Sequence, residues 1–103
     1  MFDMMKKLQE AQRQMKEIKE RLERVSVKGT AEPGISITAN GNRKILSVEL
    51  PENFQSMDKN ELETALRTAM DQAITNADQI NEAEMKSAAS GMMPGLGSLL
   101  SKG

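Results

Sequence analysis

MFDMMKKLQEAQRQMKEIKERLERV, residues 1–25, is the stretch around which the chain is organised. Its apolar side chains recur at alternating steps of four and three, at Met4, Leu8, Ala11, Met15, Ile18, Leu22 and Val25. An average step of about 3.5 residues over about three heptads is typical of a helix that packs along one seam. Because neither Gly nor Pro interrupts residues 3–25, we expect a single helix about 35 Å long. This length predicts that the helix also packs against something beyond its own chain.

The charge of this helix is uneven along its length. Residues 1–28 hold eight Lys/Arg and five Asp/Glu, whereas residues 58–103 hold four and seven. Lys6, Arg13 and Lys16 fall within an arc of about 80° opposite the apolar seam, where a face of this kind is either solvated or binds phosphates. Further along, the i,i+4 spacing predicts ion pairs between Glu17 and Arg21 and between Glu20 and Arg24.

After Val25 the apolar period changes to two, which predicts strands. Three short alternating runs, within residues 25–30, 35–40 and 46–50, are separated by turn signals at Glu32-Pro33-Gly34 and Asn40-Gly41. The sequence therefore predicts a three-stranded antiparallel meander with one apolar face, which has to be covered.

A second helix is predicted from a capping box at Asp58 and Glu61 to about Ser87. It carries a broad apolar stripe rich in alanine, which permits close approach to a sheet. We assign residues 1–88 to one α+β domain. Residues 89–103, rich in Gly, Met, Ser and Leu, are expected to form a flexible tail, and their apolar side chains leave docking on a partner open.

Composition excludes several classes of chemistry. The 103 residues contain no Cys and no His, so nucleophile–histidine and thiolate sites are ruled out. We expect no enzyme activity, no metal or other cofactor and no small-molecule substrate. Phe2 and Phe54 are the only aromatic residues, which argues against stacking on single-stranded nucleic acid. No apolar run is long enough for a signal peptide or a membrane span, so a soluble cytoplasmic protein is expected.

Three segments also resemble a known family: Lys28-Gly29-Thr30-Ala31, Ile35-Ser36-Ile37-Thr38-Ala39-Asn40-Gly41 and Ile45-Leu46-Ser47-Val48-Glu49-Leu50. The leading MMKKLQEAQRQM and the trailing Ser90-Gly91-Met92-Met93-Pro94-Gly95-Leu96 fit its two ends. The chain is similar to YbaB/EbfC nucleoid-associated proteins. This resemblance implies an α-β-β-β-α fold and a bacterial homodimer that joins through its sheets and projects its long helices.

The resemblance further implies binding of double-stranded DNA in the nucleoid, with roles in nucleoid organisation and gene regulation. The cations of the first helix would then contact phosphates, and neighbouring amides could read bases, which gives a predicted set of Lys6, Lys7, Gln9, Gln12, Arg13 and Lys16. If these residues do not bind DNA, the next candidates are Lys28, Arg43 and Lys44.

A second reading of the long helix stays open. A coiled-coil adaptor would use the apolar seam to bind another protein. A clustered basic face favours DNA, whereas an exposed, uninterrupted seam favours a protein partner.

Overall fold

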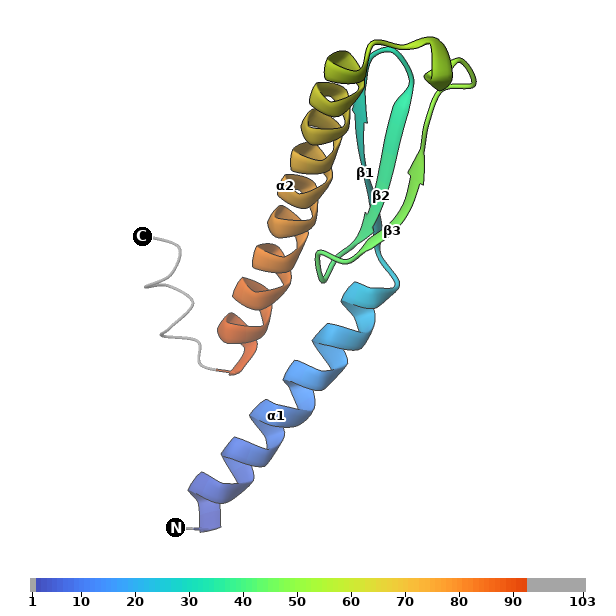
Figure 1. The fold of residues 1–103 in the computed structure, drawn as a ribbon. Coiled ribbons are helices and arrows are strands. Elements are labelled where there is room, and N and C mark those ends of the chain that lie inside the picture. The colour runs from blue at the N-terminus through green and yellow to red at the C-terminus, as the bar shows by residue number, and fades with distance from the viewer. Residues whose placement is uncertain (1, 93–103) are drawn as a thin grey trace.

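The structure is a computed structural model, and it describes residues 2–92. In chain order it contains the helix α1 (Phe2–Glu23), the strands β1 (Ser26–Ala31), β2 (Ile35–Asn40) and β3 (Ile45–Glu49), and the helix α2 (Lys59–Met92), with a short 3-10 turn, η1 (Phe54–Ser56), before α2. Figure 1 shows α2 lying along the sheet while α1 extends away from it. The predicted α+β fold, with its order helix, three strands, helix, is confirmed.

The three strands form an antiparallel sheet in the order β1-β2-β3. Val27 pairs with Ala39 and Gly29 with Ile37 across β1 and β2. A bulge between Thr38 and Ala39 shifts the register of β3, so that Ile45 pairs with Ala39 and packs against the core. The sequence pattern had placed Leu46 on the apolar face, and this expectation was wrong because the extra residue of the bulge breaks the period of two.

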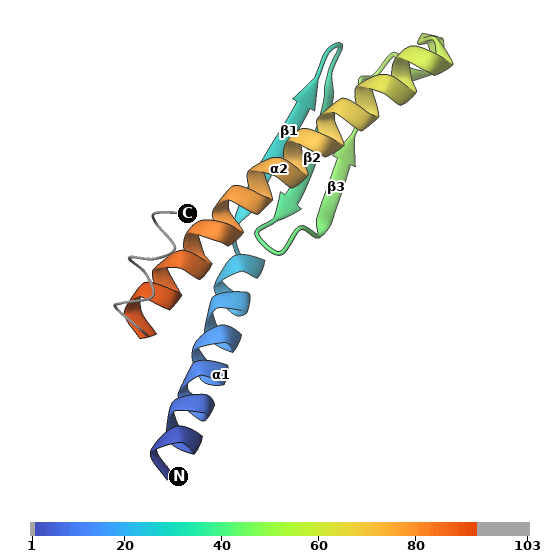
Figure 2. The same cartoon turned by 90° about the vertical axis from the view of Figure 1, so that its left-hand side faces the viewer.

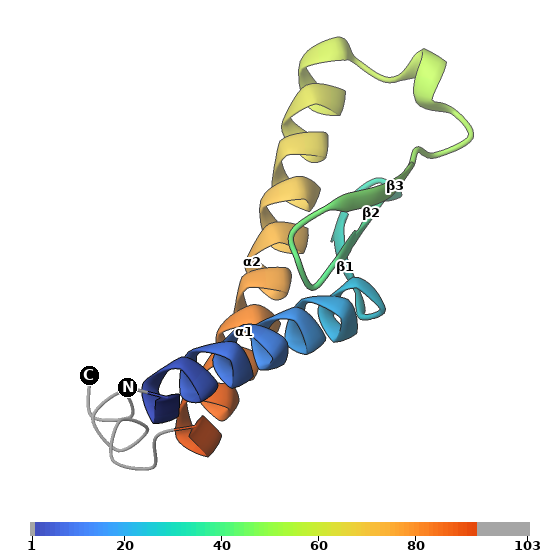
Figure 3. The same cartoon turned by 90° about the horizontal axis from the view of Figure 1, so that it is seen from below.

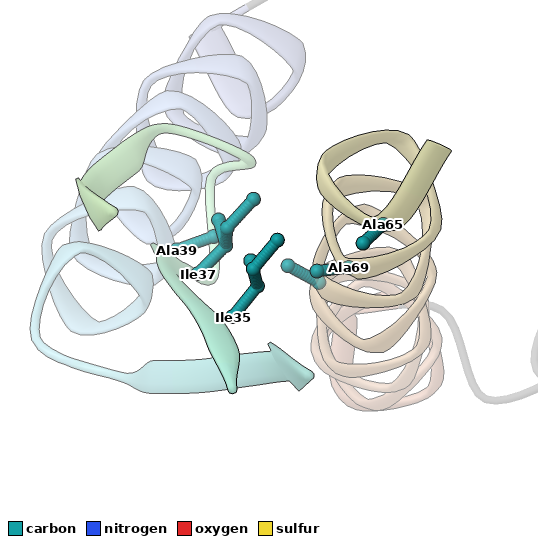
Figure 4. Packing of buried hydrophobic residues seen from close by; sticks show 6 residues of the cluster. Ile35, Ile37, Ala39, Ala65 and Ala69 are labelled. Carbon is teal, nitrogen blue, oxygen red and sulfur yellow. The ribbon is translucent and has the colours of Figure 1, made fainter. Parts of the chain in front are cut away.

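α2 covers the sheet by means of small residues. Ala65, Ala69, Ala73 and Ala77 recur at every fourth position and are all buried. In Figure 4, Ala65 and Ala69 face Ile35, Ile37 and Ala39 of β2. The helix lies so close to β1 that a Cβ added at Gly29 would stand 1.9 Å from the backbone oxygen of Ala69. Of the larger residues of the predicted stripe, Leu62 and Leu66 are partly buried against the core, whereas Met70 is exposed.

The start of α2 has the predicted N-cap at Asp58, but the capping box is incomplete, because within residues 2–92 the Glu61 side chain accepts no hydrogen bond from the Asp58 N–H. The Asp58 carboxylate accepts a hydrogen bond of 3.2 Å from the backbone N–H of Glu61, and its carbonyl accepts one of 2.9 Å from the N–H of Leu62. The end differs, because α2 continues through Gly91 to Met92 instead of ending near Ser87. The first four residues of the predicted tail are therefore helical. Residues 93–103 lie outside the described residues, and the flexibility of that segment stays a prediction.

The turn after β2 holds the carboxyl end of α1. The Gly41 N–H donates to the carbonyls of Leu22 at 2.8 Å and Val25 at 3.2 Å, which satisfies groups that a helix end leaves without partners. A Cβ at Gly41 would lie 2.8 Å from Leu22 Cδ2. Gly41 is thus required for close approach to α1, whereas the positive φ of this turn, +68°, belongs to Arg43.

The apolar seam of α1 is buried at one end only. Ile18 and Leu22, near the turn and α2, are 2% and 1% exposed, whereas Met4 and Leu8 are 78% and 62% exposed. Figures 1 and 2 show the amino-terminal part of α1 extending past the end of α2. Within the described chain, about half of the seam therefore has no covering.

Candidate nucleic-acid interface

All six predicted DNA-binding residues lie on α1, four in its amino-terminal half and two, Arg13 and Lys16, just past its midpoint. At about 100° per residue, five of them share an arc of about 120° that faces away from the apolar seam. We call these five the outward face: Lys6, Gln9, Gln12, Arg13 and Lys16. Each has an exposed side chain. Lys7 is also exposed but lies about 100° from Lys6 around the helix, beside the seam.

Arg13 is held by two carboxylates of its own helix. Its Nε donates to Glu10 at 3.1 Å, a second nitrogen also bonds Glu10, and the third lies 2.5 Å from Glu17. The hydrogen bond with Arg13 holds the pKa of the Glu10 carboxyl below its usual value, and the same contact raises the pKa of Arg13. A phosphate that binds Arg13 therefore has to compete with both acids.

The ion pairs further along α1 differ from the predicted ones. Glu17 pairs with Arg13, and Arg21 pairs with Glu84 of α2 at 3.0 Å. The predicted pair of Glu17 with Arg21 was wrong, because each of the two groups meets a different partner. The predicted pair of Glu20 with Arg24 was also wrong, since neither forms a salt bridge within residues 2–92. Helix spacing alone identifies several candidates for each charge and does not choose among them.

Lys6 and Lys16 are the outward-face cations without a salt bridge in the part of the chain that the structure describes. Ammonium groups of this kind are compact charges suited to phosphate oxygens. Gln9 and Gln12 lie between them, and their amides can both donate and accept hydrogen bonds. The outward face can therefore contact a phosphate backbone and present amides to base edges.

A groove where α1 meets the turn and α2 was missed from the sequence. It has a volume of about 410 Å³, and its apolar lining residues are Met15, Leu22 and Met85. Lys16, Lys19 and Arg43 lie around it. Only the fold brings these residues together, because they come from three separate segments. Of the fallback candidates at the sheet end, Arg43 forms an ion pair with Asp78, which reduces its availability for phosphate.

Other kinds of site have little support in residues 2–92. Within that range no group of three or more acidic side chains is placed to hold a metal ion. Neither α1 nor α2, over the residues described, combines the length and the hydropathy that crossing a bilayer requires.

Comparison with known proteins identifies relatives over nearly the whole chain. A nucleoid-associated protein of Thermus thermophilus is 37% identical over 99 residues, which cover 93% of this chain and 94% of that protein. A nucleoid-associated protein of Thermoanaerobacter pseudethanolicus is 32% identical, with 91% and 87% covered. One of Flavobacterium johnsoniae is 31% identical, with 93% and 91% covered.

The fold also matches a solved structure. The crystal structure of an uncharacterized protein from Helicobacter pylori superposes with a TM-score of 0.63 and covers 74% of this chain and 90% of its own, at 13% sequence identity. The model of the YbaB/EbfC DNA-binding family matches residues 1–92, a range that includes both helices and the sheet. On this match, and on the identity to its relatives, the chain belongs to the YbaB/EbfC DNA-binding family.

Proposed function

We propose that this protein binds double-stranded DNA as a homodimer and that the outward face of α1 contacts the phosphates. The observation that carries the proposal is the arrangement of Lys6 and Lys16, unpaired among the described residues, on a helix that projects from the sheet. A projecting helix can approach a duplex without a clash from the body of the protein. Membership of a DNA-binding family supports the choice of ligand.

Electrostatics also predict how strong this binding is. The chain carries a net charge of −1, so the whole molecule does not attract DNA and the local cations have to do so. Arg13 contributes less than its charge suggests, because Glu10 and Glu17 hold it. We therefore expect weak, salt-sensitive affinity with modest sequence preference, a combination that suits a protein distributed over the nucleoid.

The homodimer is proposed from the α2-facing surface of the sheet, which α2 covers over β1 and β2 but leaves exposed over β3. α2 lies against β1 and β2, and Figure 3 shows β3 beyond them. Val48 pairs with Ile37 and so shares its face of the sheet, yet it is 47% exposed. Leu50, Phe54 and Met70 are also exposed apolar residues. A second copy packed here would remove this apolar surface from water.

The two edges of the sheet support the same conclusion. Side chains of α2 satisfy the outer edge of β1: Gln72 accepts from the Thr30 N–H at 2.7 Å, and Asn76 donates to the Lys28 carbonyl at 2.9 Å. In the described part of the chain, no side chain covers the outer edge of β3 in this way. An exposed edge strand is a natural site for pairing with another copy.

The proposed ligand is tested by measuring the fluorescence anisotropy of labelled DNA with the full-length protein. We expect duplexes of unrelated sequence to bind with similar affinity, and single strands of the same length to bind less well. The reason is that the chain has only two aromatic residues on which bases could stack. Tighter binding of single strands than of duplexes, or no binding of either at low salt, would contradict the proposal.

A further inference from the structure

The uncovered part of the α1 seam is a second surface on the projecting helix. We call it the amino-terminal seam, and it consists of Met4, Leu8, Ala11 and Met15. Met4, Leu8 and Met15 are exposed, although the same stripe continues into the buried Ile18 and Leu22. It lies on the side of α1 opposite Lys6, Arg13 and Lys16, so DNA held by these cations would leave it free.

The residues that flank this seam carry a distinct charge. In heptad terms Leu8 and Met15 occupy a positions and Met4 and Ala11 occupy d positions, so the flanking e and g positions are Met5, Lys7, Gln12 and Gln14. These flanks contain a cation and two amides and no acid. Residues at these positions choose the partner of a coiled coil through their charge, and the next flanking positions, Lys19 and Arg21, are cationic as well.

The buried half of the seam shows what kind of helix fits against it. There α1 contacts α2, and the flanking Arg21 pairs with Glu84 of α2 at 3.0 Å. Apolar residues of α1 are covered while a flanking cation meets an acid on the covering helix. The amino-terminal seam repeats the α1 side of this arrangement, with exposed apolar residues and the flanking cation Lys7. α2 reaches it only at Met15, which lines the groove with Met85, and the amino-terminal part of α1 extends past the end of α2.

We propose that the amino-terminal seam docks an amphipathic helix of a partner protein whose apolar stripe is flanked by acidic residues. A second copy of α1 fits less well, because it would bring the same cations and amides and no acid to Lys7. The free seam is also only about 12 residues long, which is marginal for a self-paired coiled coil without help from charge. The projecting helix would then hold DNA on one face and a protein on the other.

The proposal is tested with a synthetic peptide of about four heptads that has Leu at a and d and Glu at e and g. Its binding to the full-length protein is measured by fluorescence anisotropy. One control peptide has Lys in place of Glu, and a second keeps Glu but has Ser in place of Leu. We expect the Glu/Leu peptide to bind and both control peptides to bind at least about tenfold more weakly.

Variants of the protein locate the site. Leu8→Gln should weaken binding of the Glu/Leu peptide about tenfold, since it removes an apolar contact from the centre of the seam. Lys7→Glu should weaken binding of the Glu/Leu peptide and strengthen binding of the Lys peptide. Lys6→Glu is the matched control, because it makes the same change at the neighbouring position on the opposite face, and it should change peptide binding less than Lys7→Glu.

Four outcomes would overturn the proposal. The first is equal binding of the Glu and Lys peptides, and the second is an equal effect of Lys6→Glu and Lys7→Glu. The third is binding of the Glu/Leu peptide only after residues 93–103 are deleted, which would assign the seam to the chain's own end. The fourth is capture by vesicles of anionic lipid without any binding of the Glu/Leu peptide, which would assign the seam to a membrane surface.

Discussion

Arg13 has two opposing effects on DNA binding. Its positive charge attracts phosphate, but its ion pairs with Glu10 and Glu17 reduce its availability. Glu10→Gln should therefore raise the affinity for duplex DNA at neutral pH by about two- to fivefold, the range expected from loss of an exposed ion pair. Glu20→Gln removes a charge from the same helix without a contact to Arg13. If Glu10→Gln raises the DNA affinity no more than Glu20→Gln does, loss of the ion pair with Glu10 does not make Arg13 available to phosphate.

The same contact predicts the direction of a pH effect. Arg13 keeps the pKa of Glu10 below the usual 4.5 in the folded protein, so the ion pair stabilises α1 above that pH. This stabilisation is lost as the pH falls through the lowered pKa, and Arg13 then becomes available. DNA affinity of the wild-type protein should rise over that range more steeply than affinity of the Glu10→Gln variant, as measured by anisotropy at constant ionic strength.

Gly29 sets the distance between the sheet and α2. Gly29→Ala should destabilise the protein by about 2 kcal/mol or more, because the new methyl group meets the backbone of Ala69, which cannot rotate away. Thermal unfolding followed by circular dichroism measures the effect. Lys28→Ala, at the exposed neighbouring position, should change the free energy of unfolding by less than about 0.5 kcal/mol. Equal melting temperatures for both variants would contradict this packing.

Sequence patterns predicted some residue roles and missed others for physical reasons. The cap at Asp58 is local and was predicted, because its partner lies three residues away. The tight contact of Gly41 with Leu22 joins residues 19 positions apart, so the Asn40-Gly41 pattern predicted a turn but gave no reason for the close approach. The pairing of Arg21 with Glu84 likewise depends on how two helices lie together.

At the scale of elements, α1 consists of a docked half and a projecting half. Ile18→Asp should destabilise the protein by about 3 kcal/mol or more, because Ile18 is 2% exposed and an unpaired charge there loses its water. Leu8→Asp makes the same change in the same stripe at an exposed position and should leave the melting temperature nearly unchanged. Equal melting temperatures for the two variants would contradict the packing of only the carboxyl-terminal half of α1 against the rest of the protein.

The elements themselves could be predicted from the sequence because their signals are periodic and local. Steps of four and three residues predicted α1, and alternation with two turn signals predicted the sheet. The bulge in β3 was missed, since one extra residue changes which side chain faces the core without changing composition. The end of α2 was placed too early. The composition shifts at Ser87, and the glycines and the proline from Gly91 to Gly97 were interpreted as a block to the helix, which nevertheless continues to Met92.

The whole molecule should be a dimer. At micromolar concentration we expect sedimentation equilibrium to give twice the chain mass of 11.4 kDa. Val48→Lys should shift the protein toward the monomer, because it places a charge on the exposed surface of β3 where the second copy is proposed to pack. Leu8→Lys is the control, since it changes an exposed apolar residue on α1, away from the sheet, and should leave the dimer intact. A wild-type protein that sediments as a monomer would contradict the proposed homodimer.

The candidate interface could be predicted only in part, because the pairing of charged side chains depends on the folded structure. Helix periodicity placed Lys6, Arg13 and Lys16 together, and the helix in the structure keeps them on one face. Which of these cations is available depends on neighbouring acids, and the sequence did not show that Arg13 is held while Lys6 and Lys16 form no salt bridge within residues 2–92. In the proposed dimer, two copies of Lys6 and Lys16 would present four such cations to one duplex.

The salt dependence of duplex binding tests this interface most directly. With about four phosphates neutralised, a plot of log affinity against log salt should have a slope near −3.6, at about 0.9 per phosphate. The double variant Lys6→Gln/Lys16→Gln should bind all duplexes more weakly and flatten the slope by about 3.6, because it removes all four of these cations from the dimer. The control Lys28→Gln/Lys44→Gln should keep the wild-type slope. An unchanged slope for Lys6→Gln/Lys16→Gln would contradict binding through the outward face of α1. If the slope of the control is flattened at the same time, the DNA binds at the sheet instead.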